Sequence, residues 1–258
     1  MLSAAVLVPL VLGCIWSGGS VFAVLVVLVA VGLSREWLAL CGRHHSPAAW
    51  VIFASVPLAV ILTEWDTAAH AFILLIVATL AGVAVTRGAS PARPLAFGVP
   101  YLGLGAIALV WLRQPVETGC ANVIVLLFIV WASDIGAYMF GRAIGGPRLA
   151  PAISPGKTWS GSVGGLVASA LIGVAAALIL GNGAPLWRSV SFAVLIGCIS
   201  QAGDLFESLV KRHFGVKDSG AMIPGHGGLL DRLDALLAAA PVAALLALVL
   251  GPGVGLWE

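Results

Sequence analysis

The chain alternates between long apolar blocks and short polar stretches rich in Gly, Pro and Arg. Each apolar block runs for roughly 15 to 22 residues, the length that a helix needs to cross the hydrocarbon core of a bilayer. The pattern therefore predicts an all-α protein, a polytopic integral membrane helical bundle with about nine transmembrane helices. The predicted spans cover about residues 2–16, 21–40, 49–62, 69–85, 95–112, 121–140, 161–180, 186–202 and 229–250.

Composition excludes an ordinary soluble domain. Hydrophobic residues make up 60% of the chain and the mean hydropathy is +1.09, well above the usual apolar share. The four cysteines are scattered without the spacing of metal ligands, so no zinc site or disulfide framework is implied. The N-terminal block lacks a basic lead-in, which favours a first span over a cleaved signal.

Basic residues are distributed unevenly between the loops, and this predicts the topology. Only Arg113 and Arg188 lie on one side, and Arg232 lies at the start of the ninth span. Because Lys and Arg are retained in the cytoplasm, we expect the N-terminus inside and the C-terminus outside the cytoplasmic (inner) membrane. The ten residues on the predicted cytoplasmic side are Arg35, Arg43, Arg87, Arg93, Arg142, Arg148, Lys157, Lys211, Arg212 and Lys217.

Acidic residues divide the chain into a scaffold and a catalytic part. Residues 1–130 hold four of the eleven acids, all at span ends or in loops, whereas residues 131–234 hold six. We therefore predict an N-terminal scaffold of about five spans, 1–120, and a C-terminal catalytic region of about four spans, 121–258. The active site is expected at cytoplasmic loops 141–160 and 204–228.

Asp134 lies within or near the end of the sixth predicted span. A charged carboxylate facing lipid costs roughly 2.5–3.5 kcal/mol on insertion scales, so Asp134 must face a protein interior or a wet cavity. One interpretation is an interhelical ion pair, for which Arg142 is a candidate partner. The favoured interpretation is a metal or cation site.

The segment ISPGKTWSG, residues 153–161, places a turn, an ammonium group and hydroxyls directly before a predicted helix. Helix N-termini favour anions through their free amides and macrodipole, so Ser154, Lys157 and Thr158 are candidate phosphate ligands. The segment is not a P-loop, because that motif needs glycine where the chain has Pro151. The alternative is a plain helix cap with a lysine that reaches toward the membrane surface.

Carboxylates lie at both ends of the longest polar stretch. Asp204 and Glu207 are three residues apart, with Lys211 four further on, so all three share a face if the eighth helix continues outward. Asp231 and Asp234 are likewise three apart at the start of the ninth span. One or two carboxylates completed by substrate phosphates are the usual way to hold Mg²⁺.

Cations and glycines fill the space between these acids. Lys211, Arg212 and Lys217 suit a polyphosphate, and Gly227 and its neighbours allow close backbone approach. A basic loop that only touches anionic lipid would explain Lys211 and Arg212 but not the acids. His226 is a candidate base, phosphate donor or loop-structuring residue; the last two are favoured, since a phosphate nucleophile is already ionised near neutral pH.

The stretch SLVKRHFGVKDSGAMIPGHGGLLDRLD, residues 208–234, resembles the signature of the phosphatidate cytidylyltransferases (CDP-diacylglycerol synthases). The resemblance extends to GDLFES, ISPGKTWSG and SDIGAYMFGR, and thus covers about residues 130–235. Two departures are visible. Ser160 stands where the family usually has Glu, and Gly145-Gly146 replaces a usual Gly-Lys.

The resemblance implies that CTP and phosphatidic acid give CDP-diacylglycerol and pyrophosphate with Mg²⁺, in contact with membrane lipids. Small residues such as Gly161, Gly164 and Gly165 allow helix packing within or between chains, so a homodimer is a separate prediction. It implies Asp204 and Asp231 as principal metal ligands, with Asp134 and Asp234 next. The roles implied for the remaining residues are phosphate binding by Ser154, Lys157, Thr158, Lys211, Arg212 and Arg232, and catalysis by Asp204, Asp231, Lys217 and His226.

Two other classes stay open from the sequence. A transporter with intramembrane carboxylates would show paired broken spans in both halves, whereas the polar residues here gather in one half. Another lipid-phosphate enzyme, such as a polyprenol kinase or a CDP-archaeol-type synthase, shares the chemistry.

Overall fold

The computed structural model describes residues 2–43, 46–85, 92–181, 183, 185–220, 222, 227–251 and 255–257. Helices occupy all nine predicted spans, which confirms the all-α membrane fold, and the third span is a pair of helices. Seven spans are long and apolar enough to cross a membrane, whereas α1 and α5 are shorter as apolar helices. The helices are α1 (Leu2–Ser17), α2 (Gly19–Leu40), α3 (Pro47–Phe53), α4 (Ser55–Trp65), α5 (Ala68–Val85), α6 (Ala92–Arg113), α7 (Gly119–Ile144), α8 (Trp159–Leu180), α9 (Leu186–His213) and α10 (Leu230–Leu250).

The chain forms two compact units. The first comprises Met1–Val116 and Asp218–Leu233, and the second comprises Glu117–Lys217 and Asp234–Glu258. The boundary after Val116 lies near the predicted division at 120/121. The segment Asp218–Leu233 packs with the N-terminal unit, although its sequence neighbours belong to the second.

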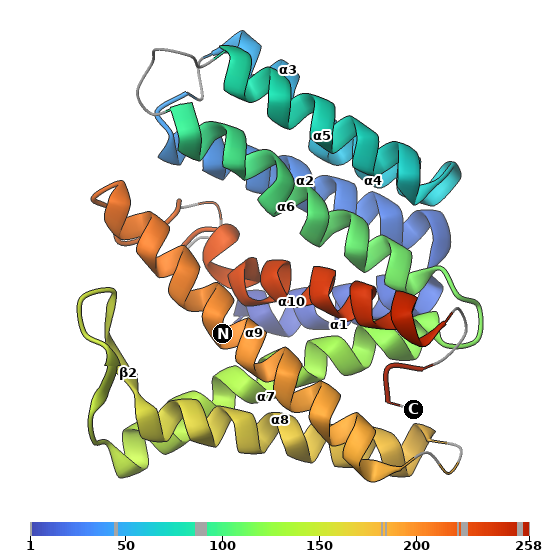
Figure 1. Ribbon diagram of the computed structural model, residues 1–258, viewed down its shortest axis with the longest axis vertical. Coiled ribbons are helices and arrows are strands. Elements are labelled where there is room, and N and C mark those ends of the chain that lie inside the picture. The colour runs from blue at the N-terminus through green and yellow to red at the C-terminus, as the bar shows by residue number, and fades with distance from the viewer. Residues whose placement is uncertain are drawn as a thin grey trace. The chain divides into compact units, whose positions relative to one another are not determined.

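The first unit is built on α2, α4, α5 and α6, which pack against one another (Figure 1). Its core contains Trp37 and Phe53, both at most 1% exposed. The Trp37 ring lies 5.6 Å from Tyr101 and 6.3 Å from Phe97, between ring centroids. Such aromatic contacts join α2 to α6 beyond simple area burial.

In the second unit α7 and α8 run side by side, and glycines allow their backbones to approach closely (Figure 1). A Cβ on Gly161 would lie 2.7 Å from the Ala137 carbonyl oxygen, and one on Gly165 would lie 2.6 Å from that of Ser133. Small residues permit this packing in membranes, where apolar side chains gain nothing from leaving lipid. The glycines of α8 therefore serve packing within the chain.

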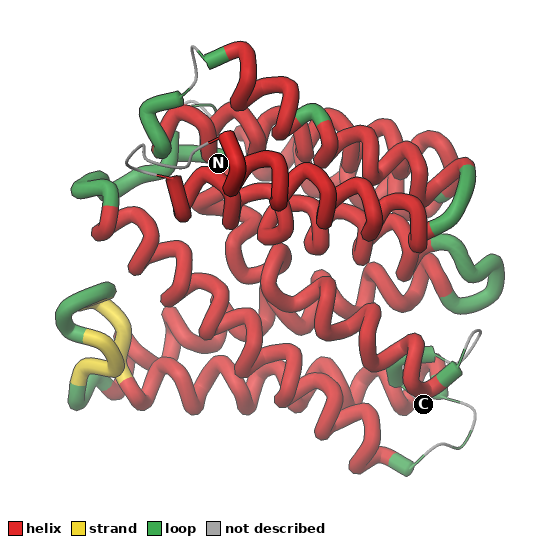
Figure 2. Tube along the Cα trace, turned by 45° about the horizontal axis from the view of Figure 1, so that its top comes forward, coloured by secondary structure: helices red, strands yellow, loops and turns green. Residues whose placement is uncertain are grey.

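The polar stretch between α7 and α8 contains an antiparallel hairpin, where the sequence predicted only a loop. Strands β1 (Arg148–Ala150) and β2 (Ser154–Thr158) pair Arg148 with Thr158 and Ala150 with Ser154 (Figure 2). Gly145 and Gly146 end α7 with φ angles of 66° and 100°, a region that glycine enters without steric cost. The two glycines thus end α7 shortly before β1 begins at Arg148.

Candidate functional site

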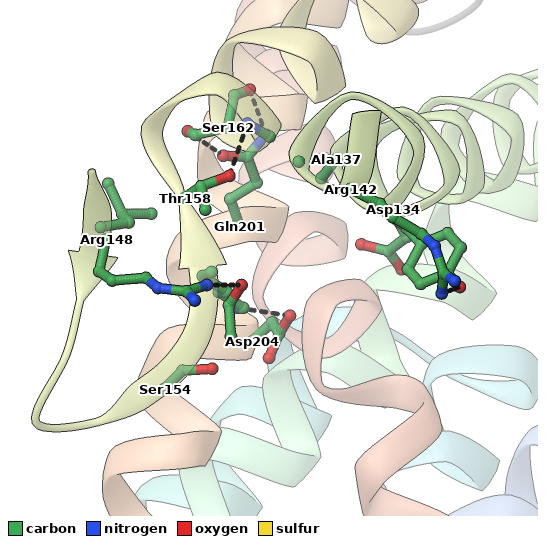
Figure 3. Close-up of a pocket in the computed structure, with 15 residues that line it drawn as sticks. Asp134, Ala137, Arg142, Arg148, Ser154, Thr158, Ser162, Gln201 and Asp204 are labelled. Atoms are coloured by element: carbon green, nitrogen blue, oxygen red, sulfur yellow. Dashed lines mark hydrogen bonds and ion pairs between the residues drawn. The ribbon is translucent and has the colours of Figure 1, made fainter. Parts of the chain in front are cut away.

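A cavity of about 550 Å³ lies in the second unit, bounded by α7, the hairpin, α8 and α9 (Figure 3). It combines two carboxylates with three basic side chains and several hydroxyls. The lining residues are Asp134, Ala137, Tyr138, Gly141, Arg142, Arg148, Leu149, Ser154, Gly156, Lys157, Thr158, Gly161, Ser162, Gln201 and Asp204. The structure therefore gathers the Asp134 motif, the 153–161 segment and Asp204, which the sequence had identified separately.

The two carboxylates differ in their partners. Asp204 on α9 forms an ion pair with Lys157 on β2, with 2.5 Å between Oδ2 and Nζ. Within the described ranges the Asp134 carboxylate makes no hydrogen bond or ion pair. The candidate partner Arg142 instead donates from Nη1 to the Tyr138 hydroxyl at 3.1 Å. The structure thus gives no support to an Asp134–Arg142 ion pair.

Residues of the 153–161 segment cap helix α8 and also line the cavity. The Thr158 hydroxyl accepts a hydrogen bond from the Gly161 amide at 3.1 Å, so it caps α8. Ser160 donates to the Gly145 carbonyl and contacts Thr158 Oγ1. Ser160 is the residue that departs from the family pattern, and its hydroxyl links the start of α8 to the end of α7. Lys157 of the same segment lines the cavity.

Arg148 is held by the hairpin that carries it. Its Nη1 donates to the Gly156 carbonyl at 3.3 Å, across the two strands (Figure 3). Together with Arg142 and Lys157 it lines the cavity. Guanidinium and ammonium groups in one concave site suit a polyanion.

Gln201 lines this cavity and joins three helices, and it was missed from the sequence. Its Nε2 donates to the Ser133 hydroxyl of α7 at 3.2 Å and to the Ser162 carbonyl of α8 at 3.1 Å. Its Oε1 accepts from the Ser162 hydroxyl at 2.5 Å. The only sequence signal was a polar residue one turn before Asp204 on the same helix.

Replacing Gln201 by alanine is expected to destabilise the protein by about 1–3 kcal/mol, because buried polar groups of α7 and α8 lose their partner. The catalytic rate should fall together with the stability, since Asp204 lies one turn from Gln201 on the same helix. Thermal unfolding in detergent measures the first effect and initial rates the second. The matched control is Gln114→Ala, whose side chain donates only to the Thr63 carbonyl in the first unit; an equal loss of activity there would contradict the expectation.

The cations beyond Asp204 do not line the cavity, and two of them are held by other groups. Lys211 pairs with the buried Glu207 at 2.6 Å on one face of α9, as expected from their spacing once α9 continues to His213. Arg212 donates from Nε to the Ile153 carbonyl at 3.3 Å, which links the end of α9 to the hairpin turn. Lys217 is exposed.

The acids around α10 fall into different units. Asp231, in the first unit, accepts from the amides of Ser219 and Gly228 at 3.0 and 2.9 Å. Asp234, in the second unit, is 8% exposed and lies within electrostatic range of Asp204 and Asp134. Arg232 is exposed, and His226 lies outside the described residues.

No three His, Cys, Asp or Glu groups in the described part of the chain lie close enough to hold a metal ion together. Asp134 and Asp204 nevertheless line the same cavity. Mg²⁺ is commonly bound by one or two carboxylates with water and substrate phosphates completing the shell. The residues present therefore fit a metal that arrives with a phosphate-bearing substrate.

Comparison with known proteins gives consistent matches. The model of the cytidylyltransferase family matches residues 1–250. Phosphatidate cytidylyltransferases of Brucella suis and Brucella abortus are each 38% identical over 247 residues, which is 93% of this chain and 89% of those proteins. The phosphatidate cytidylyltransferase of Staphylococcus saprophyticus is 38% identical over 148 residues, covering 57% of this chain and 56% of that protein.

Proposed function

The chain belongs to the cytidylyltransferase family, and we propose that its reaction takes place in the cavity of the second unit. The protein is a phosphatidate cytidylyltransferase, which converts CTP and phosphatidic acid to CDP-diacylglycerol and pyrophosphate. The observation that carries the assignment to this cavity is that Asp134, Asp204 and three basic side chains line one space at the ends of apolar helices.

Phosphate binding follows from the charges of the cavity. Arg142, Arg148 and Lys157 would share the triphosphate of CTP and the phosphate of the lipid, because paired cations offset their repulsion. The Ser154 hydroxyl, on the same strand as Lys157, adds a neutral donor. Lys157 lies against Asp204, so the arriving phosphates compete with that carboxylate for the ammonium group.

Asp134 and Asp204 would hold Mg²⁺ in the cavity, with further coordination from substrate phosphates. Bound there, the ion would polarise the phosphates and neutralise charge as pyrophosphate leaves. Asp234 is the nearest further carboxylate in the second unit. The roles that the family resemblance implies for the other residues stay predictions: Asp231 as metal ligand, Lys211, Arg212 and Arg232 as phosphate ligands, and Lys217 and His226 in catalysis.

The bond that forms joins a phosphate oxygen of phosphatidic acid to the α-phosphorus of CTP. The bond that breaks joins that phosphorus to the oxygen bridging to the β-phosphorus. A phosphomonoester is largely ionised near neutral pH, because its second pKa is about 6, so the attacking oxygen needs no proton acceptor. The protein's contribution is to position two polyanions and to offset their charge.

The second substrate is a lipid, and the outer side of α7 suits its acyl chains. Tyr138 lines the cavity and is 66% exposed, and its neighbours Ile135 and Met139 are 60% and 59% exposed. An apolar surface beside a charged cavity lets a phosphate enter while the hydrocarbon stays in the membrane. The transporter alternative supplies no reason for three cations beside the carboxylates.

We place the cavity at the cytoplasmic face of the inner membrane. Its three basic residues belong to the loops that the charge distribution puts inside. Membrane lipids then surround the spans, and CTP reaches the cavity from the cytoplasm. A homodimer stays a prediction from the small residues of the chain.

The test uses the purified full chain in detergent with phosphatidic acid, Mg²⁺ and CTP labelled at either the α- or the γ-phosphorus. We expect the α-label in the lipid product and the γ-label in pyrophosphate. A lipid kinase would give the reverse, with the γ-label in the lipid, and a transporter would leave CTP intact. Replacing phosphatidic acid by polyprenol or by an archaeal-type ether lipid phosphate tests the other lipid-phosphate enzymes; preferred turnover of either would contradict the proposal.

A further inference from the structure

Helix α7 carries an exposed stripe of side chains that ends in a charged residue at the cavity. Ile135, Tyr138 and Met139 are each more than half exposed, and Arg142, one turn further on, is exposed as well. Residues three or four positions apart share one face of a helix. The four side chains therefore form a single surface, the α7 stripe, in which apolar and aromatic groups are followed by a guanidinium group.

The opposite face of α7 is buried against α8. The carbonyl oxygens of Ser133 and Ala137 lie where a Cβ on Gly165 or Gly161 would be, at 2.6 and 2.7 Å. At about 3.6 residues per turn, Ser133 and Ala137 lie on the side of the helix roughly opposite the α7 stripe. Because α7 is long and apolar enough to cross a membrane, the stripe is a surface that lipid hydrocarbon can cover.

The three basic residues of the cavity differ in what they contact. Lys157 pairs with Asp204 at 2.5 Å, and Arg148 is held across the strands of the hairpin. Arg142 donates to the Tyr138 hydroxyl at 3.1 Å and has no carboxylate partner within the described ranges. Figure 3 shows Arg142 on the side of the cavity away from Arg148 and Asp204. Arg142 is therefore the cavity cation that belongs to the lipid-facing helix.

Phosphatidic acid has the same layout as the α7 stripe, with two acyl chains and a phosphate monoester at one end. Arg142 lies roughly 10 Å along the helix from Ile135, at about 1.5 Å per residue. Its guanidinium group presents paired N–H donors that match the oxygens of a phosphate. The Tyr138 hydroxyl, which accepts from Arg142, can donate its own proton to the same phosphate.

A simple membrane anchor would explain only part of this arrangement. Arginine and tyrosine at the end of a spanning helix commonly extend toward lipid head groups. Such an anchor has no need to line a cavity together with Lys157 and Asp204, as Arg142 and Tyr138 do. The shared cavity brings a phosphate held by Arg142 into the space where CTP is proposed to bind.

We propose that Arg142 and Tyr138 form the subsite for the phosphate of phosphatidic acid, whose acyl chains lie along the α7 stripe. Arg148 and Lys157, from the hairpin side, then hold the triphosphate of CTP. The inference rests on the proposed function and divides its cations between the two substrates. In an in-line displacement the attacking oxygen enters opposite the leaving pyrophosphate, and subsites on different sides of one cavity provide that separation.

Arg142→Gln tests the proposal in the purified full-length protein, in mixed micelles of detergent and lipid. The KM for phosphatidic acid, expressed as its mole fraction, should rise at least tenfold, while the KM for CTP changes less than twofold. Arg148→Gln should give the reverse pattern. Arg142→Lys should recover part of the affinity for the lipid, because the charge returns without the planar fork.

Binding without turnover provides a second measurement. In the absence of CTP and Mg²⁺, phosphatidic acid should raise the melting temperature of the wild type as its mole fraction increases. Phosphatidylglycerol, a phosphodiester, should raise it less. Arg142→Gln should need at least tenfold more phosphatidic acid for the same rise. Glycerol 3-phosphate has the monoester without acyl chains, so an equal effect of this compound would assign the subsite to free phosphates and contradict the lipid assignment.

Arg188→Gln is the matched control. Arg188 is an exposed basic residue of the second unit whose guanidinium carbon lies 5.6 Å from the ring centroid of the exposed Trp187, but it does not line the cavity. Its replacement should leave both KM values and the response to phosphatidic acid unchanged. An equal loss there would mean that anionic lipid is attracted by charge in general.

Three further outcomes would overturn the proposal: an unchanged KM for phosphatidic acid in Arg142→Gln, equal rises in both KM values, and an unchanged melting response to the lipid. If Arg142→Gln fails to fold, Tyr138→Phe keeps the ring, and it should raise the KM for phosphatidic acid about threefold with the KM for CTP unchanged. A wild-type protein that forms no CDP-diacylglycerol would instead contradict the proposed function, and the melting comparison would still report whether Arg142 binds the lipid phosphate.

Discussion

Changing Asp134 to asparagine is expected to lower kcat by about 100-fold or more while leaving the melting temperature equal or higher. Activity falls because a carboxylate that faces the phosphates and their Mg²⁺ is lost, and single electrostatic groups of this kind contribute about 10²–10³ in rate. Stability is preserved because Asp134 lies on a membrane-spanning helix without an ion pair or hydrogen bond in the described structure. Neutralising it removes a desolvation penalty.

Opposite changes in rate and stability separate a functional carboxylate from a structural one. A residue that held helices together would lose stability and activity in parallel. Asp66→Asn is the control: Asp66 is an exposed acid of the first unit, paired with His70 at 2.5 Å, and its replacement should leave kcat unchanged. A kcat within fivefold of the wild type in Asp134→Asn would contradict the assignment, as would a marked loss of stability. Initial rates across a Mg²⁺ titration and thermal unfolding provide both measurements.

The sequence identified the side chains of this cavity but not how they combine. Each of Asp134, Lys157 and Asp204 stood out as a charge beside or within an apolar block, which is costly unless it has a function. Helical periodicity also predicted the Glu207–Lys211 contact, since both residues lie on one helix. The ion pair between Lys157 and Asp204 joins a strand to a distant helix, and no local rule specifies it.

Contacts to backbone groups were not predictable from the sequence. Glu36 accepts from the backbone amides of Leu229 and Leu230, and no sequence pattern names such partners, because every residue except proline carries an amide N–H. The hairpin was missed for a related reason. Its strands are short and contain Ser154, Pro155 and Gly156, which favour turns in isolation, and packing at the start of α8 decides their pairing.

Replacing Lys157 by methionine is the second change for which we expect a large effect, a fall of about 100-fold or more in kcat/KM for CTP. Methionine keeps an unbranched apolar stem of nearly the same length and removes the charge that would meet the triphosphate, while Asp204 loses its counter-ion. Lys157→Arg should recover part of the activity, because the charge returns in a planar group of different reach. Arg188→Ala, at the other end of α9, is the control and should retain full activity.

The contact between Lys157 and Asp204 makes a stricter test available, because residues in direct contact are not energetically independent. We expect the double variant Lys157→Met/Asp204→Asn to be little worse than the more impaired of the two single variants. The second substitution acts on a site that has already lost the interaction. Multiplicative losses would mean that the two residues serve the reaction separately, and the ion pair would then be incidental to phosphate binding. The same rate assay on four proteins decides between these outcomes.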